Sequence, residues 1–217
     1  MKQQTIRYRR AIAPLGLLGL CGLLASCSLF GSKQAPLVTT YALEMNAASN
    51  AAMGSPMPSR HVLLIEVPRA VPGYDSTHMV YVRKPMQQES YAYSVWTDTP
   101  AHMLAPLLRT QLAQCGGFGA VLLIPSAAKA DLRLDSTILR LHQDFLQTPS
   151  VVRFGMQLTL MNNVTREVLA VHTFDVIEPA HSEDAAGGAE AANAAVQQGL
   201  QQVAAFLQTA VAALPAD

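Results

Sequence analysis

Cys27 is the residue whose type and position most clearly suggest chemistry. It follows Leu24, Ala25 and Ser26 at the end of the uncharged run AIAPLGLLGLCGLLAS, and four basic residues but no acidic residue precede that run. A basic start, an apolar middle and small residues before a cut are typical of a secretory signal peptide. The run is sixteen residues long and contains Pro14. Because a membrane-spanning helix needs about 20 apolar residues, we expect this segment to be removed.

The tetrapeptide LASC resembles the lipobox of bacterial lipoproteins. In that motif the cysteine thiol receives a diacylglycerol, the signal is cut just before the cysteine, and the new amino terminus is acylated. The chemistry requires cysteine, because only a thiolate is nucleophilic enough to take the glyceryl carbon under mild conditions. The resemblance implies a lipid anchor at Cys27, removal of residues 1–26, and a tether at residues 27–38. An ordinary signal peptide with an incidental cysteine is the alternative.

Sites built on cysteine or histidine are not expected elsewhere. Cys21 leaves with the leader and the sulfur of Cys27 would become a thioether, so Cys115 is the only free thiol left. An internal disulfide and a zinc site of paired cysteines are therefore excluded. The six histidines show no HExxH or HxH spacing. We expect no metal and no cofactor.

Patterns that could support catalysis are equally weak. Ser76 and His78 lie close together in YDSTH, but a nucleophile and its base normally come from separate elements, and no GxSxG occurs. We interpret YDSTH as a turn. CGGFGA follows a predicted helix and precedes a predicted strand, the reverse of the order in a phosphate-binding loop. We therefore expect no enzyme, and a hydrolase using Ser76 or His78 is the least favoured hypothesis.

Composition limits the partners and the number of domains. Removing the leader takes away four of the 15 Lys and Arg residues and none of the 15 Asp and Glu residues, which leaves a net charge of about −4. A nucleic-acid partner requires a basic face, so we expect none. The remaining chain is long enough for one ordinary domain, which we place at residues 39–217.

Apolar and alternating segments predict about seven strands. The clearest covers residues 150–161, where apolar and polar residues alternate as in a half-buried antiparallel strand. Its predicted inner face is Val152, Phe154, Met156, Leu158 and Leu160. The sequence MNNVTRE has the chemistry of a hairpin turn, and we interpret the sequon that begins at Asn163 in the same way. The other predicted strands are TTYALEM, HVLLIEVP, MVYVR, AVLLIP, 131–146 and 166–178, and SYAYSVW is either a further strand or an extended lead into the helix that follows.

A first helix is predicted in DTPAHMLAPLLRTQLAQCGG. Asp98 or Thr99 can cap its start, and Gly116 can end it. Its apolar face would contain the leucines at 104, 108 and 112 together with Cys115. Pro106 lies inside this segment, and an internal proline removes a hydrogen bond and tends to kink a helix.

A second helix is predicted near the C-terminus, after a loose loop HSEDAAGGAEAAN. Apolar residues recur every three or four positions from Val196 to Leu214, which indicates an amphipathic helix. Leu207 lies on the apolar stripe and Gln208 near the opposite edge. The predicted fold is α+β: a two-layer sandwich with a mainly antiparallel sheet of about seven strands and two helices packed on it.

Tyr91, Tyr93 and Trp96 are the candidate contact residues for a partner or a lipid. They lie together in YAYSVWTDTP, and aromatic side chains are common at interfaces. The alternative, which we favour for some of them, is that they pin the start of the first helix onto the sheet.

The order of these segments resembles the ABC-type transport auxiliary lipoprotein family, also described as paraquat-inducible protein C-like. The residues that carry the resemblance are LASC, the early YAL, LLIEVP followed by YDSTHMVYVR, YAYSVWTDTPAHMLAPLLRTQL, the three long strands and the closing Ala-rich helix. It covers nearly the whole mature chain. The loop from Asn46 to Ser59 and Pro106 depart from the family pattern.

The resemblance implies a periplasm-facing auxiliary subunit of a lipid or hydrophobic-solute transport system. Its partners would be a mammalian-cell-entry domain protein and an ABC permease and ATPase, with a homo-oligomer left open. Ser28 stands where a retention signal for the inner membrane usually carries aspartate, which favours anchoring in the outer membrane. Anchoring in the inner membrane is the alternative location. An outer-membrane assembly lipoprotein is the second hypothesis for function.

Overall fold

The computed structural model describes residues 36–45, 61–115 and 117–214. The chain divides into two units, Met1–Pro36 and Leu37–Asp217, and every element described below belongs to the second. The predicted lipid site Cys27, the loop from Asn46 to Ser59 and the helix stop at Gly116 lie outside the described residues. Within the described part of the chain, none of the helices has the length and apolar character needed to cross a bilayer.

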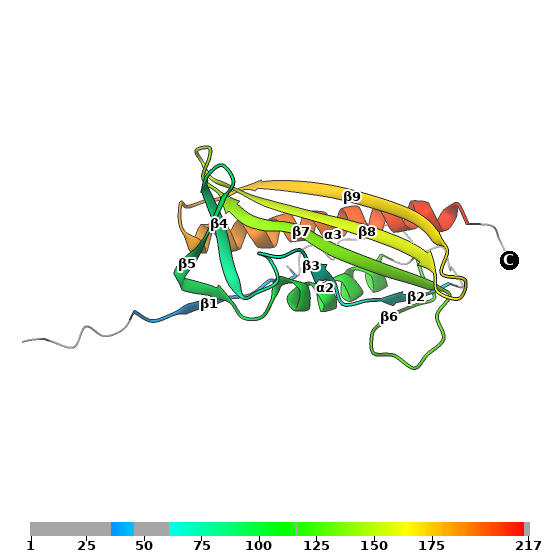
Figure 1. The fold of residues 1–217 in the computed structure, drawn as a ribbon. Coiled ribbons are helices and arrows are strands. Elements are labelled where there is room, and N and C mark those ends of the chain that lie inside the picture. Colours follow the sequence, from blue (N-terminus) through cyan, green and yellow to red (C-terminus); the bar gives the residue numbers. More distant parts are fainter. Residues whose placement is uncertain (1–35, 46–60, 116, 215–217) are drawn as a thin grey trace, which may run out of the picture. The chain divides into compact units, whose positions relative to one another are not determined.

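Nine strands and two helices make up the described part of the unit (Figure 1). The α+β class and the mainly antiparallel sheet with two helices are confirmed. In chain order the elements are β1 (Thr39–Tyr41), β2 (Val62–Ile65), β3 (Arg69–Ala70), β4 (His78–Lys84), β5 (Gln87–Trp96), α2 (Pro100–Gln114), β6 (Ala120–Leu123), β7 (Leu132–Asp144), β8 (Val151–Asn162), β9 (Val168–Pro179) and α3 (Ala185–Ala212).

β7 is the strand on which the sheet is organised. One edge pairs antiparallel with β8 from end to end, and β8 pairs in the same way with β9. The other edge of β7 pairs in parallel with three short strands in turn, first β2, then β3, then β4. Strand β6 continues the sheet from β2, and β5 and β1 continue it from β4. The long pairings are thus antiparallel, and the parallel ones are short.

A shift in register changes which residues of β7 point into the core. Before the shift, Leu134, Ser136 and Ile138 are buried, and after it the alternation continues with Leu141 and Gln143, while Asp144 at the end of the strand is buried as well. The irregularity lies between Ile138 and Arg140, where one extra residue reverses the alternation. A simple alternating pattern would therefore assign half of this strand to the wrong face.

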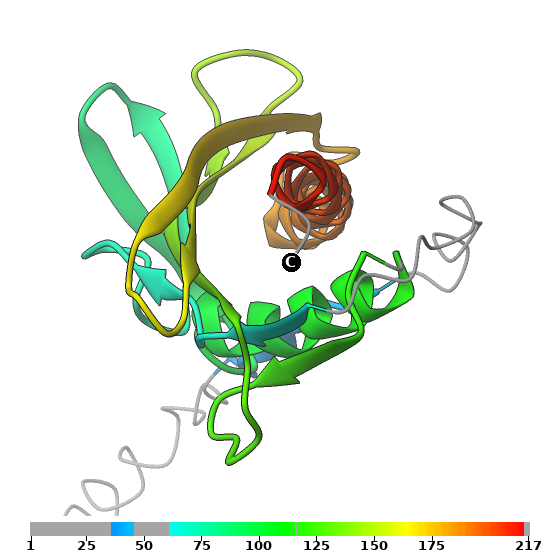
Figure 2. The same cartoon turned by 90° about the vertical axis from the view of Figure 1, so that its right-hand side faces the viewer.

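Helix α3 packs on the concave face of the sheet formed by β7, β8 and β9. Seen end-on, the three strands curve around the helix (Figure 2). All five residues predicted for the inner face of β8 are buried. Gly199 allows the helix to lie close to β8 and β9, because a Cβ atom placed there would lie 2.6 Å from Phe154 and 2.9 Å from Phe174. The two phenyl rings meet edge to face, with centroids 5.8 Å apart.

The start predicted for this second helix is wrong. The segment treated as a loose loop is helical from Ala185, and Asp184 caps it by accepting a hydrogen bond from the backbone N–H of Gly187 at 2.9 Å. Alanine and glycine in this first part of the helix are mostly buried. A helix can lie close to a sheet only where its side chains are small. The alanine- and glycine-rich segment that suggested a linker is therefore a buried part of the helix.

Helix α2 begins as predicted, with Thr99 as its cap. The Thr99 hydroxyl accepts a hydrogen bond from the N–H of His102, and Pro100 occupies the first turn. The leucines at 104, 108 and 112 and Cys115 are buried on one face, as predicted. Pro106 lies inside the helix and leaves the carbonyl of His102 without its usual donor. Both residues are exposed, so water can satisfy that carbonyl.

Candidate interaction surface

The candidate aromatic residues lie where the pairing of β5 with β4 is interrupted. β5 pairs with β4 as far as Ser90 and again at Val95, and its last three residues, Ser94 to Trp96, pair in parallel with β1 on the other edge. Between them the register shifts, so Tyr91 and Tyr93 sit at a bend in the strand. The bend brings the three candidate residues into different surroundings.

Trp96 belongs to the core. Only 5% of its surface is exposed, and it joins the same buried cluster as Leu43, Met79 and Met103. Its backbone N–H donates to the carbonyl of Thr77 at 2.8 Å. Trp96 therefore fixes the entry to α2, as in the alternative that we favoured for some of these residues, and it is not available as a surface contact.

Tyr91 is half-buried and takes part in a polar junction. Its hydroxyl donates to Oε1 of Gln143 at 2.8 Å, and the Gln143 amide donates to the Ser150 hydroxyl at 2.9 Å. A Cβ atom on Gly188 would lie 2.2 Å from the same Oε1, so the glycine leaves room for the Gln143 carboxamide in this position. Burial raises the pKa of Tyr91 well above its usual range, so the hydroxyl stays a proton donor. The junction joins β5, β7, β8 and α3.

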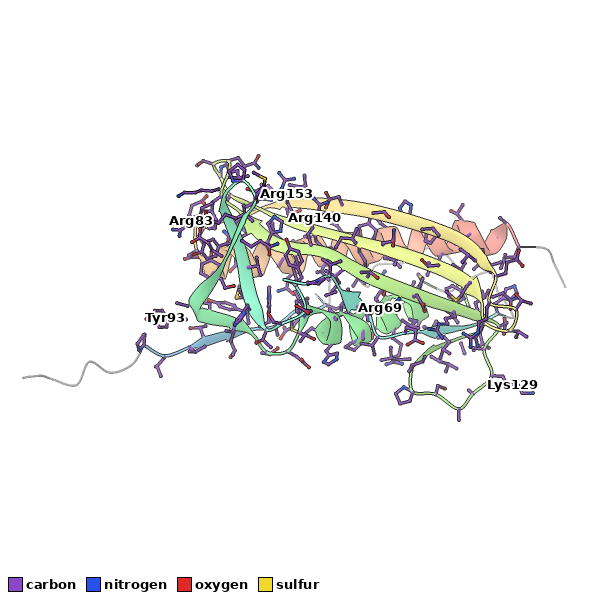
Figure 3. All side chains as sticks on the ribbon, viewed as in Figure 1. Arg69, Arg83, Tyr93, Lys129, Arg140 and Arg153 are labelled. Atoms are coloured by element: carbon purple, nitrogen blue, oxygen red, sulfur yellow. The ribbon has the colours of Figure 1, made fainter. Side chains whose placement is uncertain are left out.

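Tyr93 is the candidate residue that the structure leaves accessible, with 55% of its surface exposed. Figure 3 shows it close to the start of β1. Of the three residues singled out from the sequence, Tyr93 is thus the one that offers most of its ring to a partner or lipid.

The β4–β5 hairpin carries a second group of aromatic and charged side chains. The rings of Tyr81 and Tyr91 lie 4.7 Å apart, and Phe145 meets Tyr81 edge to face at 5.9 Å. Arg83 pairs with Glu89 across the hairpin. These contacts brace the hairpin against the start of the β7–β8 turn, and Met86 at its tip is fully exposed. The sequence did not single out this hairpin, because its contacts are formed between distant segments.

The outer face of the sheet carries ion pairs between residues of different strands. Arg140 on β7 reaches across β8 to Asp175 on β9, with the charged atoms 3.4 Å apart. The two side chains cross above Gly155, whose missing side chain leaves the space they use. Arg153 donates to Asp144 at 2.7 Å, and Figure 3 shows both arginines on this face. Burial alone would raise the pKa of Asp144, but its hydrogen bonds from Arg153 and from the backbone N–H of Leu146 lower it overall.

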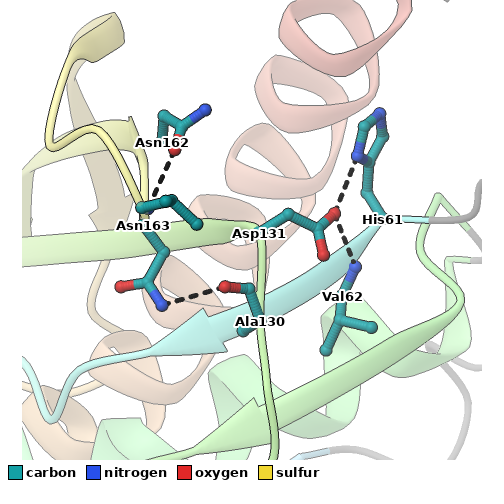
Figure 4. A network of polar contacts seen from close by, with 7 residues as sticks. His61, Val62, Ala130, Asp131, Asn162 and Asn163 are labelled. Atoms are coloured by element: carbon teal, nitrogen blue, oxygen red, sulfur yellow. Dashed lines mark hydrogen bonds and ion pairs between the residues drawn. The ribbon is translucent and has the colours of Figure 1, made fainter. Parts of the chain in front are cut away.

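The opposite end of the sheet is fixed by a polar network (Figure 4). Asp131 accepts a hydrogen bond from the backbone N–H of Val62 at 3.2 Å and pairs with Nδ1 of His61 at 2.8 Å. The Asn163 amide donates to the carbonyl of Ala130 at 2.9 Å. The predicted turn at the sequon is confirmed, and Asn163 helps to hold that turn against the start of β7.

The residues considered for catalysis serve local structure. The Ser76 hydroxyl accepts a hydrogen bond from the backbone N–H of His78 at 3.3 Å, which stabilises the turn predicted there. Among the described residues, no group of three or more His, Cys, Asp or Glu side chains could hold a metal ion. A cavity between β4, β5, β7 and α3 has a volume of about 10 Å³, enough for one water molecule. Cys115 is buried, and burial raises the pKa of its thiol, which makes it a poor nucleophile.

The sequence of this domain matches a known protein family. The family model for the ABC-type transport auxiliary lipoprotein component covers residues 41–204, from β1 into the second half of α3. The chain belongs to this family. The match includes every candidate contact residue, all of α2 and most of α3.

Solved structures show the same fold for the family domain. A protein from Xanthomonas campestris, described as a member of the family DUF330, is 22% identical, with a TM-score of 0.72 over 80% of this chain and 96% of that one. An uncharacterised protein is 13% identical, with a TM-score of 0.62 over 79% of this chain and 99% of that one. A comparison with curated proteins gave no match.

Proposed function

We propose that this protein is a lipid-anchored, periplasm-facing and non-enzymatic auxiliary subunit of an ABC transport system. The observation that carries the proposal is membership of the auxiliary lipoprotein family over residues 41–204. The LASC sequence supports an anchor at Cys27, and the removal of residues 1–26 follows from the same proposal. The system would be of the type that moves lipids or hydrophobic solutes with a mammalian-cell-entry domain protein.

The proposed role is to dock the transport conduit at a membrane. A single domain of this length has a radius of gyration of about 16 Å, which is too small to bridge two membranes. Ser28 after the anchor favours the outer membrane over the inner one. The use of the Ser76 and His78 pair in a turn, and of Cys115 in the core, supports a role in binding rather than catalysis.

Capture of the full chain from detergent-solubilised membranes tests this role. We expect a mammalian-cell-entry domain protein, an ABC permease or its ATPase to be enriched with the wild type. The Cys27→Ala variant is the control, since it lacks the proposed anchor but keeps the domain. Enrichment of a β-barrel assembly protein in place of transport subunits would contradict the proposal and favour the assembly hypothesis.

A further inference from the structure

Exposed apolar residues lie together at the start of the domain. Thr39 on β1 pairs with Ser94 on β5 in a parallel register. Continuing this register by one residue places Val38 beside Tyr93, and neighbours on adjacent strands point to the same side. Leu37 is 91% exposed and Val38 57%, in addition to Tyr93. We call Leu37, Val38 and Tyr93 the β1 patch.

The position of the β1 patch in the chain connects it to the proposed anchor. Cys27 precedes Leu37 by ten residues. Even when fully extended, that stretch spans at most about 35 Å. A lipid on Cys27 therefore keeps the β1 patch within that distance of the bilayer surface, closer along the chain than any other part of the domain.

The charge pattern around the patch suits a lipid surface. No charged residue occurs in residues 37–43 or in residues 90–97, which form the two paired strands and their flanks. Approach of these two stretches to a bilayer therefore desolvates no charged side chain of their own. Tyrosine is favoured in the headgroup region, where its ring is buried and its hydroxyl remains hydrated. The absence of Lys and Arg in these stretches means that contact would not require anionic lipid.

We propose that the β1 patch rests in the headgroup region of the membrane that carries the anchor, so that the domain docks on the lipid surface by this end. The proposal depends on the proposed function, because it requires a lipid on Cys27. It adds a second contact, made by the folded domain itself, and predicts which residues make it.

Fluorescence quenching in vesicles tests the proposal. The full lipidated chain carrying Tyr93→Trp is reconstituted into phosphatidylcholine vesicles with or without brominated acyl chains. Trp96 is buried and provides the same background in every sample. We expect brominated lipid to quench the added emission, to the same extent at low and high salt. Ile177→Trp on β9 is the matched control, because Ile177 is exposed but distant along the sheet from the patch, and its emission should be unchanged.

Two measurements on the same samples separate the possible failures. Mass spectrometry of the chain reports whether Cys27 is lipidated, and an unmodified Cys27 would overturn the proposed function. A lipidated chain in which neither Tyr93→Trp nor a second variant, Val38→Trp, is quenched would overturn the β1 patch proposal alone.

Discussion

Single glycine residues mark the places where α3 lies closest to the sheet. Gly188 lies over Gln143, and Gly199 lies over Phe154 and Phe174. Glycine weakens a helix by about 1 kcal/mol relative to alanine. Its presence at these positions therefore indicates that close packing outweighs helix propensity.

Gly199→Ala should destabilise the domain although alanine favours helix. The new Cβ atom would lie 2.6 Å from the phenyl ring of Phe154, which is fully buried in the core. We expect a loss of about 1 to 3 kcal/mol in the free energy of unfolding, measured by urea denaturation. Gln202→Ala, an exposed change in the same helix, is the control and should shift it by less than about 0.5 kcal/mol. A stabilised Gly199→Ala variant would contradict the packing described here.

His142 links stability to pH. Its Nδ1 lies 2.9 Å from the Tyr74 hydroxyl, and the two rings stack with centroids 5.8 Å apart. Burial lowers the pKa of His142, which also faces Asp144, Arg140, Arg153 and Asp175. The unfolded side chain titrates near pH 6.5, so below that pH the unfolded state binds a proton that the folded state resists. The stability that neutral His142 contributes to the folded state is fully present above about pH 6.5 and is lost as the pH falls below that value.

We therefore expect the urea midpoint of the wild type to fall between pH 7.5 and pH 5.5, and to fall less in His142→Gln. His181 is exposed, so His181→Gln should retain the pH dependence of the wild type. Equal pH dependence in wild type and His142→Gln would show that another group is responsible.

The two helices are joined to each other as well as to the sheet. Gln208 donates to the carbonyl of Cys115 at the end of α2, at 3.0 Å. The sequence pattern places Gln208 near the edge opposite the apolar stripe, where a truncation usually changes stability little. The structure shows instead that the side chain is half-buried and hydrogen-bonded, so Gln208→Ala should lower the free energy of unfolding by about 1 kcal/mol.

Leu207 tests whether the apolar stripe of α3 is core. Its side chain is completely buried, in contact with the main hydrophobic cluster. Leu207→Ala should lower the free energy of unfolding by about 2 to 5 kcal/mol. The exposed residue Gln201 on the same helix is the matched control, and Gln201→Ala should have little effect. An unchanged urea midpoint for Leu207→Ala would assign the stripe to an interface instead.

Elements with a regular pattern could be predicted from the sequence, and elements defined by their partners could not. The inner face of β8 follows from strict alternation, and the start of α2 follows from its capping residue. The two-residue strand β3 has too few residues for a pattern, since its pairing with β7 defines it. The first turns of α3 were missed because alanine and glycine indicate both a linker and a tightly packed helix.

Which candidate contact residue is exposed is decided at the scale of the whole molecule. Sequence grouped Tyr91, Tyr93 and Trp96 because they are close in the chain. The bend in β5 separates them, and only the three-dimensional pairing with β1 and β4 determines which one is exposed. The polar junction around Gln143 involves segments far apart in sequence, and no local signal could have revealed it.

The anchor and the folded domain should be separable. Cys27→Ala should prevent incorporation of a labelled fatty acid, while the domain keeps its wild-type urea midpoint, because every core residue that the structure describes lies after the tether. Metabolic labelling and denaturation measure the two properties independently. Equal label in wild type and variant would refute lipidation at Cys27.

The position of β7 in the chain also has a consequence for biogenesis. β2, β3 and β4 all precede β7 in the chain, yet all three pair with the same edge of β7. A chain exported N-terminus first would deliver these short strands before the strand that receives them, and pairing between segments far apart in sequence is slow to form. Until residue 144 has emerged, apolar segments such as VLLI present unpaired edges that favour aggregation. The topology therefore leaves part of the segment 61–96 without its partner strand until β7 is available.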